Sequence, residues 1–432
     1  MAYSPTNVEA TSATPSTPGE PAWQTGPAAE AGGTLLISLT SLPAEALETT
    51  LTNLALAFPG TIAGQPAAFQ TMVATPDAGH PALSGSAFGS LRLLPYTPAS
   101  TGTGALYLTA GDYLNTYKVA QENNATACLL LGPEAQTLSP EAIRTLAAAL
   151  MPASGSATGS PVDLAVPRYR LGTHEGLVNS AILYPVTRAL YGARPRFPLA
   201  IDLGISLRMA ERLATMAQTF TAAGQSDAIL WPVAEAATAN FTIVEVDFGP
   251  RTLPQPASTD LNALLAQIAG SLFSDITLKA SIWQRVRNTQ APRNLSQSRG
   301  STERWPDVSP MLETFRLAYT NLHEIWALVL PPNSLLGLKH LSQMPAASFR
   351  MSDALWARIV YDFVLAYRLR TINRGHLMGA LTPLYLAWVA SHIILADSGT
   401  APEQHIEDLA GVFENDKAYL VSRWRWPDRF NP

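Results

Sequence analysis

Few features of this sequence suggest a secreted or a nucleic-acid-binding protein. Its single cysteine, Cys128, excludes a disulfide within the chain, and the apolar run around it favours a buried thiol. Charged residues make up only 14% of the chain, and 33 acids against 28 bases leave no excess of positive charge to attract nucleic acid. No basic segment followed by an apolar one opens the chain, so we expect no secretory signal and a cytoplasmic location.

Long uninterrupted apolar runs are also missing. The best candidate for a membrane span is residues 377–396, which include Thr382, Pro383, Ser391 and His392. A proline and polar side chains favour a bent helix buried within the protein over a span of the bilayer. We therefore expect no transmembrane segment.

The chain does contain enough apolar residues, 47% of 432, for a sizeable core in one large or two ordinary domains. Residues 1–32 are rich in Ala, Thr, Ser, Pro and Gly, which predicts a disordered tail. Beyond them we expect strands over 34–39, 69–74, 91–94 and 127–131, and helices over 44–57, over 104–122 and after the cap Ser139-Pro140-Glu141. This alternation predicts an α/β fold with a parallel sheet covered on both faces.

From Met311 onward the pattern is almost entirely helical. The last helix is expected over 402–415. We expect the aromatic and basic segment that follows, residues 419–424, to pack back on the core.

The densest run of chemically specific residues is Pro167 to Ser206. A helical pattern ends at Gly192 and leads into the basic loop Arg194-Pro195-Arg196, which is followed by Asp202 on an apolar segment. A carboxylate at the end of a buried run, beside arginines, suits a site for an anionic substrate. The alternative is a surface helix with basic ends and a solvated acid, and composition alone favours that alternative.

The same run resembles the glucosyl-3-phosphoglycerate synthase and mannosylglycerate synthase group of GT-A glycosyltransferases. The family pattern is roughly P-x-Y, D-G-T-x-T-N, Y-P-L-T-R-A-L-Y-G and R-x-R-x-P-x-G-G-D-F-G-x-S. The matching residues are Pro167, Tyr169, Gly176, Tyr184-Pro185, Thr187 to Gly192, Arg194, Arg196, Pro198, Asp202, Gly204 and Ser206. The departures are Glu175, Leu177, Asn179-Ser180 and Ala200-Ile201.

The resemblance implies an α/β fold: a GT-A (Rossmann-like) nucleotide-sugar-binding domain over residues 33–260 and a mostly helical C-terminal region over 261–432. It implies transfer of a sugar, as by a hexosyltransferase, from a nucleotide-sugar to a small anionic acceptor of the glycerate type, and it implies a homodimer. Asp202 and Arg188 take the catalytic positions. The acceptor-binding positions are Tyr169, Glu175, Gly176, Asn179 and Arg196.

The donor side departs further from the family. Its metal-binding D-x-D motif, which would hold Mg²⁺ or Mn²⁺, is degenerate here as Gly132-Pro133-Glu134, so Glu134 is the only ligand left, and the metal-ligating His falls near Arg251. The glycine-rich phosphate segment retains Gly102 and Gly104 but has Thr103 in place of its lysine. The donor-binding positions implied by the resemblance are thus Asp77, Gly102, Gly104 and Glu134.

Three hypotheses remain open. In an active enzyme, Arg188, Arg194, Arg196 and Arg251 would neutralise the diphosphate in place of the metal, while Asp202 would orient the acceptor hydroxyl or act as a base. Asp202→Asn and Arg188→Ala are then expected to abolish transfer and leave thermal stability nearly unchanged. The second hypothesis is a pseudoenzyme that keeps the fold and serves as a binding or regulatory partner. The third is a purely structural or adaptor role.

Overall fold

The structure is a computed structural model that describes residues 33–62, 65–66, 69–79, 88, 91–98, 106–151, 161–172, 175–254, 260–287 and 306–427. The tail predicted over residues 1–32 and the donor-site glycines Gly102 and Gly104 lie outside the described residues. By its contacts, the chain from Gly33 to Pro432 forms one unit. The boundary predicted at residue 260 lies within this unit, between the last strand and the helix that follows it.

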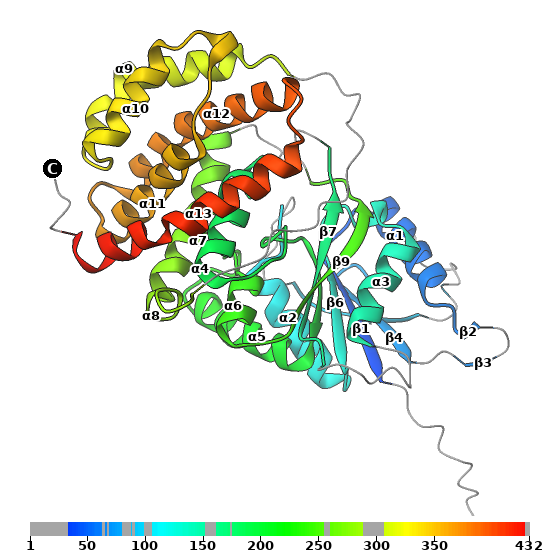
Figure 1. Cartoon of the computed structure of the whole chain (residues 1–432). Coiled ribbons are helices and arrows are strands. Elements are labelled where there is room, and N and C mark those ends of the chain that lie inside the picture. Colours follow the sequence, from blue (N-terminus) through cyan, green and yellow to red (C-terminus); the bar gives the residue numbers. More distant parts are fainter. Residues whose placement is uncertain are drawn as a thin grey trace, which may run out of the picture. The chain divides into compact units, whose positions relative to one another are not determined.

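A seven-stranded, mostly parallel sheet forms the centre of the α/β part (Figure 1). Its strands are β1 (Thr34–Leu39), β4 (Gln70–Thr75), β5 (Arg92–Pro95), β6 (Ala127–Leu131), β7 (Leu164–Arg170), β8 (Asp202–Ser206) and β9 (Ile243–Pro250). Their order is β5-β4-β1-β6-β8-β7-β9, and β8 runs antiparallel to both of its neighbours. The strands β1 and β6 are apolar and buried along most of their length, as expected for the middle of a sheet covered on both faces. The α/β prediction, with a Rossmann-like arrangement, is confirmed.

Helices cover both faces of this sheet. The helix α1 (Ala44–Ala57) packs against α3 (Pro140–Leu150), and α2 (Ala110–Glu122) packs against α5 (Leu207–Ala222) on the other side (Figure 1). A short helix, α6 (Pro232–Thr238), precedes β9, and the two short strands β2 (Thr61–Ile62) and β3 (Gln65–Pro66) pair antiparallel beside the main sheet.

Helix caps account for where these helices begin. The Ser139 hydroxyl accepts a hydrogen bond from the backbone N–H of Ala142, and Pro140 is the first residue of α3, as predicted. The helix predicted from residue 104 begins only at Ala110. Its start is fixed by a capping box in which Thr109 and Asp112 exchange side-chain and backbone hydrogen bonds.

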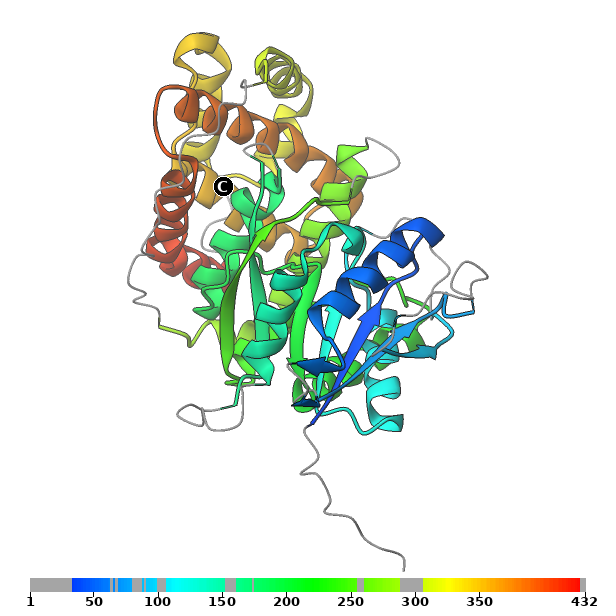
Figure 2. The same ribbon diagram turned by 90° about the vertical axis from the view of Figure 1, so that its right-hand side faces the viewer.

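Outside the sheet and the helices that cover it, the described residues are mostly helical, and from Met311 onward this agrees with the prediction. A π-helical segment, Asn179–Leu183, leads into α4 (Tyr184–Tyr191), which ends at Gly192 in the left-handed conformation. The later helices are α7 (Leu261–Leu278), α8 (Ala280–Trp283), α9 (Ser309–Ala327), α10 (Pro332–Gln343), α11 (Asp353–Leu369), α12 (Arg374–Asp397) and α13 (Pro402–Arg425). Figure 2 shows α9 to α13 gathered beside one end of the α/β part.

The last helix is longer than predicted. It continues past Asn415 to Arg425 because its end has its own place in the core: Leu420 is fully buried, and the Trp424 ring packs edge-on against Trp283 at 5.1 Å between centroids. The expectation that the aromatic end packs back on the core is confirmed.

Two helices of the described chain, α7 and α12, are long and apolar enough to cross a membrane by length and composition. In α12, 83% of the apolar window is buried against the rest of the protein, and in α7 the share is 44%. Burial of this extent in α12 is typical of a core helix.

Candidate functional site

The loops that follow β1 and β4 meet at the carboxyl edge of the sheet, where Asp77 is held in place. The Ser41 hydroxyl donates to Asp77 Oδ2 at 3.1 Å, and the Leu42 N–H donates to the same oxygen at 3.1 Å. The phenol of Tyr96, the residue after β5, donates to the carbonyl of Leu39 at 2.7 Å. This hydrogen bond links the carboxyl end of β5 to that of β1. Asp77 is half-buried, so its carboxylate is positioned yet accessible.

A second group of polar residues centres on Asp202 and Arg251, whose side chains are both fully buried. Asp202 is the first residue of β8, and because β8 is antiparallel to β6 it lies opposite Leu131, at the end of β6. The guanidinium of Arg251 donates to both carboxylate oxygens of Asp202, through Nε at 2.9 Å and Nη2 at 3.2 Å. The Tyr169 phenol and the Gly132 N–H also donate to this carboxylate.

Arg251 also binds the turn that follows β6. Its Nη2 donates to the carbonyl of Pro133 and its Nη1 to the carbonyl of Glu134, both at 2.6 Å. Nη1 further contacts the Thr137 hydroxyl at 3.1 Å and the carbonyl of Thr252 at 3.0 Å. Burial alone would lower the pKa of Arg251, but the charge and hydrogen bonds of Asp202 raise it above its ordinary value, so the guanidinium stays charged.

The residues at this edge do not fit the divalent cation that the resemblance implies. Gly132 stands where the family has its first Asp, and a Cβ at this position would collide with the carbonyl oxygen of Ile201. The Glu134 carboxylate accepts a hydrogen bond from Gln136 at 2.7 Å, and the Glu134 backbone is left-handed, with φ of 61°. No cluster of three or more His, Cys, Asp or Glu that could hold a metal occurs in the described parts of the chain.

Arg188, predicted to be catalytic, lies in a network that joins α4 to α13. It donates to Glu407 at 2.7 Å and to both carboxylate oxygens of Glu414, at 3.0 and 3.1 Å. The Tyr184 phenol donates to Glu407 at 2.6 Å. Asp202, the other predicted catalytic residue, pairs with Arg251 instead, so the two predicted residues have different charged partners.

Two of the predicted acceptor-binding residues, Asn179 and Arg196, are brought together. The Asn179 amide donates to the Arg196 carbonyl at 2.8 Å, and the Arg196 guanidinium binds the Ser180 hydroxyl and the Glu403 carboxylate. Two buried atoms of this pair, Asn179 Oδ1 and Arg196 Nη1, have no hydrogen-bond partner among the described residues.

The other three predicted acceptor residues are placed differently. The Glu175 carboxylate accepts the Gly172 N–H at 3.1 Å, and Gly176 adopts a φ of +65°, which favours glycine. Tyr169 belongs to the Asp202 group, where burial raises the pKa of its phenol well above the ordinary value. Sequence reasoning missed Ser41, Tyr96 and Thr137; their only signal is that each follows soon after a predicted strand.

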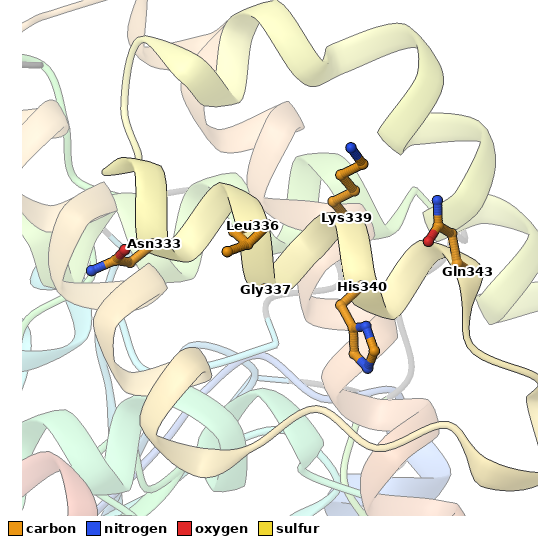
Figure 3. A pocket seen from close by; sticks show the side chains of 6 residues that line it. All are labelled: Asn333, Leu336, Gly337, Lys339, His340 and Gln343. Carbon is orange, nitrogen blue, oxygen red and sulfur yellow. The ribbon is translucent and has the colours of Figure 1, made fainter.

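Two surface hollows lie elsewhere. One, of about 690 Å³, is lined by residues of α10, shown in Figure 3: Asn333, Leu336, Gly337, Lys339, His340 and Gln343. The other, of about 440 Å³, contains Arg208 and Arg212, which pair with Asp163 and Glu235 respectively. Neither hollow brings converging polar groups from several strands together, so we take the carboxyl edge as the candidate site.

No family model and no curated protein matches the chain. Among solved structures, the chain is similar to a mycobacterial protein, with 13% identity, a TM-score of 0.35, and coverage of 57% of this chain and 74% of that one. It is also similar to a cytidylyltransferase from Leptospira borgpetersenii, with 11% identity, a TM-score of 0.28, and coverage of 60% and 100%. A mannosyltransferase from Pyrobaculum calidifontis in complex with GDP-Man and Mn²⁺ shows 9% identity, a TM-score of 0.33, and coverage of 93% and 89%.

Proposed function

We propose that the chain is a glycosyltransferase-like protein that binds a nucleotide-sugar at the carboxyl edge of β4, β1 and β6 and transfers the sugar to a small anionic acceptor. From β1 the chain proceeds to β4 and β5 on one side, and then crosses to β6 on the other. In open α/β sheets, ligands bind in the crevice outside the carboxyl ends of the strands where the order reverses in this way.

The observation that carries the proposal is the placement of Asp77. A carboxylate at the end of the strand next to the first one is suited to accept hydrogen bonds from ribose hydroxyls, as in other doubly wound folds. The hydrogen bonds from Ser41 and Leu42 fix Asp77 before a ligand arrives, which lowers the entropy lost on binding.

The unpaired atoms Asn179 Oδ1 and Arg196 Nη1 support an acceptor of the glycerate type. Buried polar atoms are nearly always hydrogen-bonded, so each atom keeps one position for a further partner: Arg196 Nη1 is a donor suited to a carboxylate, and Asn179 Oδ1 is an acceptor suited to a hydroxyl. The acceptor's identity otherwise rests on the resemblance.

A second candidate, a pseudo-glycosyltransferase that binds without transfer, is favoured by the state of Asp202. A general base must reach the proton that it removes, and the Asp202 carboxylate is fully buried and bound by Arg251, Tyr169 and Gly132. An enzyme would have to bring the acceptor hydroxyl to another group.

Nucleotide binding is the first test. In a thermal-shift screen of the full chain, nucleoside diphosphates and nucleotide-sugars are expected to raise the melting temperature. Asp77→Asn is expected to weaken binding about 10- to 100-fold, because a charged hydrogen-bond acceptor becomes a neutral one. Asp247→Asn is the matched control, since Asp247 is an exposed acid that also accepts one backbone N–H, from Gly249. Equal binding by wild type and Asp77→Asn, or no shift with any nucleotide, would contradict the proposal.

The same ligands decide between the two candidates. Mass spectrometry of a mixture of protein, nucleotide-sugar and glycerate-type acceptors detects the glycosylated acceptor if transfer occurs. Binding without product supports the pseudo-glycosyltransferase.

A further inference from the structure

We infer that Arg251 is a built-in replacement for a divalent cation: its guanidinium fills a site made of oxygen ligands, and the chain without that side chain has a divalent-cation site at the end of β6. The inference rests on the proposed function only in placing the nucleotide at this edge.

The atoms around the guanidinium carry this inference. Among the described residues, Arg251 has six acceptors, all of them oxygens at 2.6–3.2 Å from its nitrogens. They are the two oxygens of the Asp202 carboxylate, the carbonyls of Pro133, Glu134 and Thr252, and the hydroxyl of Thr137. A carboxylate with several backbone carbonyls is the ligand set that hard divalent cations prefer.

These oxygens also come from separate parts of the chain. Asp202 begins β8, Pro133 and Glu134 follow β6, and Thr252 follows β9. Carbonyl oxygens that point toward one buried place repel one another unless a positive charge lies between them. Arg251 supplies that charge, and its five N–H groups are all needed to satisfy the surrounding oxygens.

The exchange has a consequence for charge. Arg251 and Asp202 together carry no net charge, whereas a divalent cation bound to Asp202 would leave one positive charge for a diphosphate. Because the Arg251 guanidinium occupies the place of the cation, nucleotide binding at this edge is expected to be independent of divalent metal. EDTA is expected to leave the dissociation constant of the nucleotide unchanged within about twofold.

The test uses Arg251→Ala in the full chain. Removing the side chain leaves the Asp202 carboxylate and the carbonyls around a hole, so Mn²⁺ is expected to bind and to raise the melting temperature by roughly 3–5 °C at a hundredfold excess over its dissociation constant. The loss of the free Mn²⁺ signal in electron paramagnetic resonance measures the binding directly. Wild type is expected to show neither effect.

Two further variants make the test specific. Arg423→Ala also removes an arginine from a buried carboxylate, Asp362, which keeps the Tyr419 hydrogen bond, and it is expected to show no response to Mn²⁺. In Arg251→Ala with Asp202→Asn, the carboxylate ligand is gone and the response is expected to disappear. If Arg251→Ala is unfolded in EDTA, Mn²⁺ is expected to restore its cooperative unfolding transition.

An Arg251→Ala protein that neither binds Mn²⁺ nor is refolded by it would overturn the inference, as would an equal response in Arg423→Ala. These outcomes are distinct from failure of the proposed function, which is measured by nucleotide binding to the wild type.

Discussion

Arg188→Ala is expected to lower the free energy of unfolding by about 3–5 kcal/mol. The Arg188 side chain is only 6% exposed, and it is paired with Glu407 and Glu414, which are 6% and 11% exposed. Removing it leaves two carboxylates buried against α4 without their cation. Burial acts to lower the pKa of Arg188, but its hydrogen bonds to Glu414 and Tyr184 raise it above the ordinary value, so the residue contributes a full charge.

Urea denaturation at neutral pH measures this loss. The control is Arg358→Ala, which removes an arginine that is 47% exposed and paired with Asp416 and is expected to cost less than about 1 kcal/mol. Arg188→Met combined with Glu407→Gln and Glu414→Gln is expected to recover part of the stability, because no unpaired charge then remains. A loss in Arg188→Ala as small as that of the control would show that the network does not hold α13 on α4.

This result would also change how the match between residues 184–192 and the glycosyltransferase family is interpreted. The sequence alone suggested that Arg188→Ala leaves stability nearly unchanged. The contacts of Tyr184 and Arg188 with α13 lead us to expect the opposite, a large loss of stability. The indole N–H of Trp356 in α11 donates to the Ala181 carbonyl, which adds a second link to the same segment. Part of the match between Tyr184 and Gly192 thus reflects helix packing, and the catalytic role of Arg188 remains a prediction.

The elements predicted best are those whose signal is local. The strands 34–39 and 127–131 and the helix 44–57 have the predicted bounds, because continuous apolar runs and a 3.6-residue period are visible within a few residues. The strand β7 was not predicted: it contains Pro167 and two arginines, and it is held in the sheet by pairing with β9 over most of its length. Such pairing leaves no signal within the strand itself.

The candidate site shows the same limit. The position of Asp77 after a strand was visible in the sequence, but the Ser41 hydroxyl that holds it comes from a loop 36 residues away. Asp202 and Arg251 are 49 residues apart, and Arg251 lies in a segment that matches the family poorly. A single sequence gives the residue types at each position, whereas the assignment of Arg251 as the partner of Asp202 needs the register of β8 and β9 against the rest of the sheet.

Acidification is expected to destabilise the chain through a buried histidine pair between α12 and α13. The Nδ1 atoms of His392 and His405 are 2.7 Å apart, so one proton must lie between them, and the Nε2 of His405 bonds to Asp353 of α11 at 3.0 Å. The Trp388 ring stacks on both imidazoles. Burial, and then the charges of His405 and Arg196, lower the pKa of His392 to about 3, while Glu403 and Asp353 act in the opposite direction.

The sign of the pH effect follows from this lowered pKa. The folded chain keeps His392 neutral, whereas the unfolded chain binds a proton below about pH 6.5. The contribution of the neutral His392 to the free energy of unfolding is therefore fully present above pH 6.5. It is lost as the pH falls toward 3, at up to about 1.4 kcal/mol per pH unit.

Urea denaturation at pH 7, 6 and 5 measures the slope of the free energy of unfolding against pH. In His392→Gln, where the amide can still bond to His405 but does not titrate, the fall between pH 7 and 5 is expected to be smaller by about 2 kcal/mol. His340→Gln, a change at an exposed histidine of α10, is expected to keep the wild-type slope. If wild type and His392→Gln lose stability in parallel, the pair is not the titrating group. If His392→Gln alone is flatter, the packing of α12 on α13 depends on a neutral His392 imidazole.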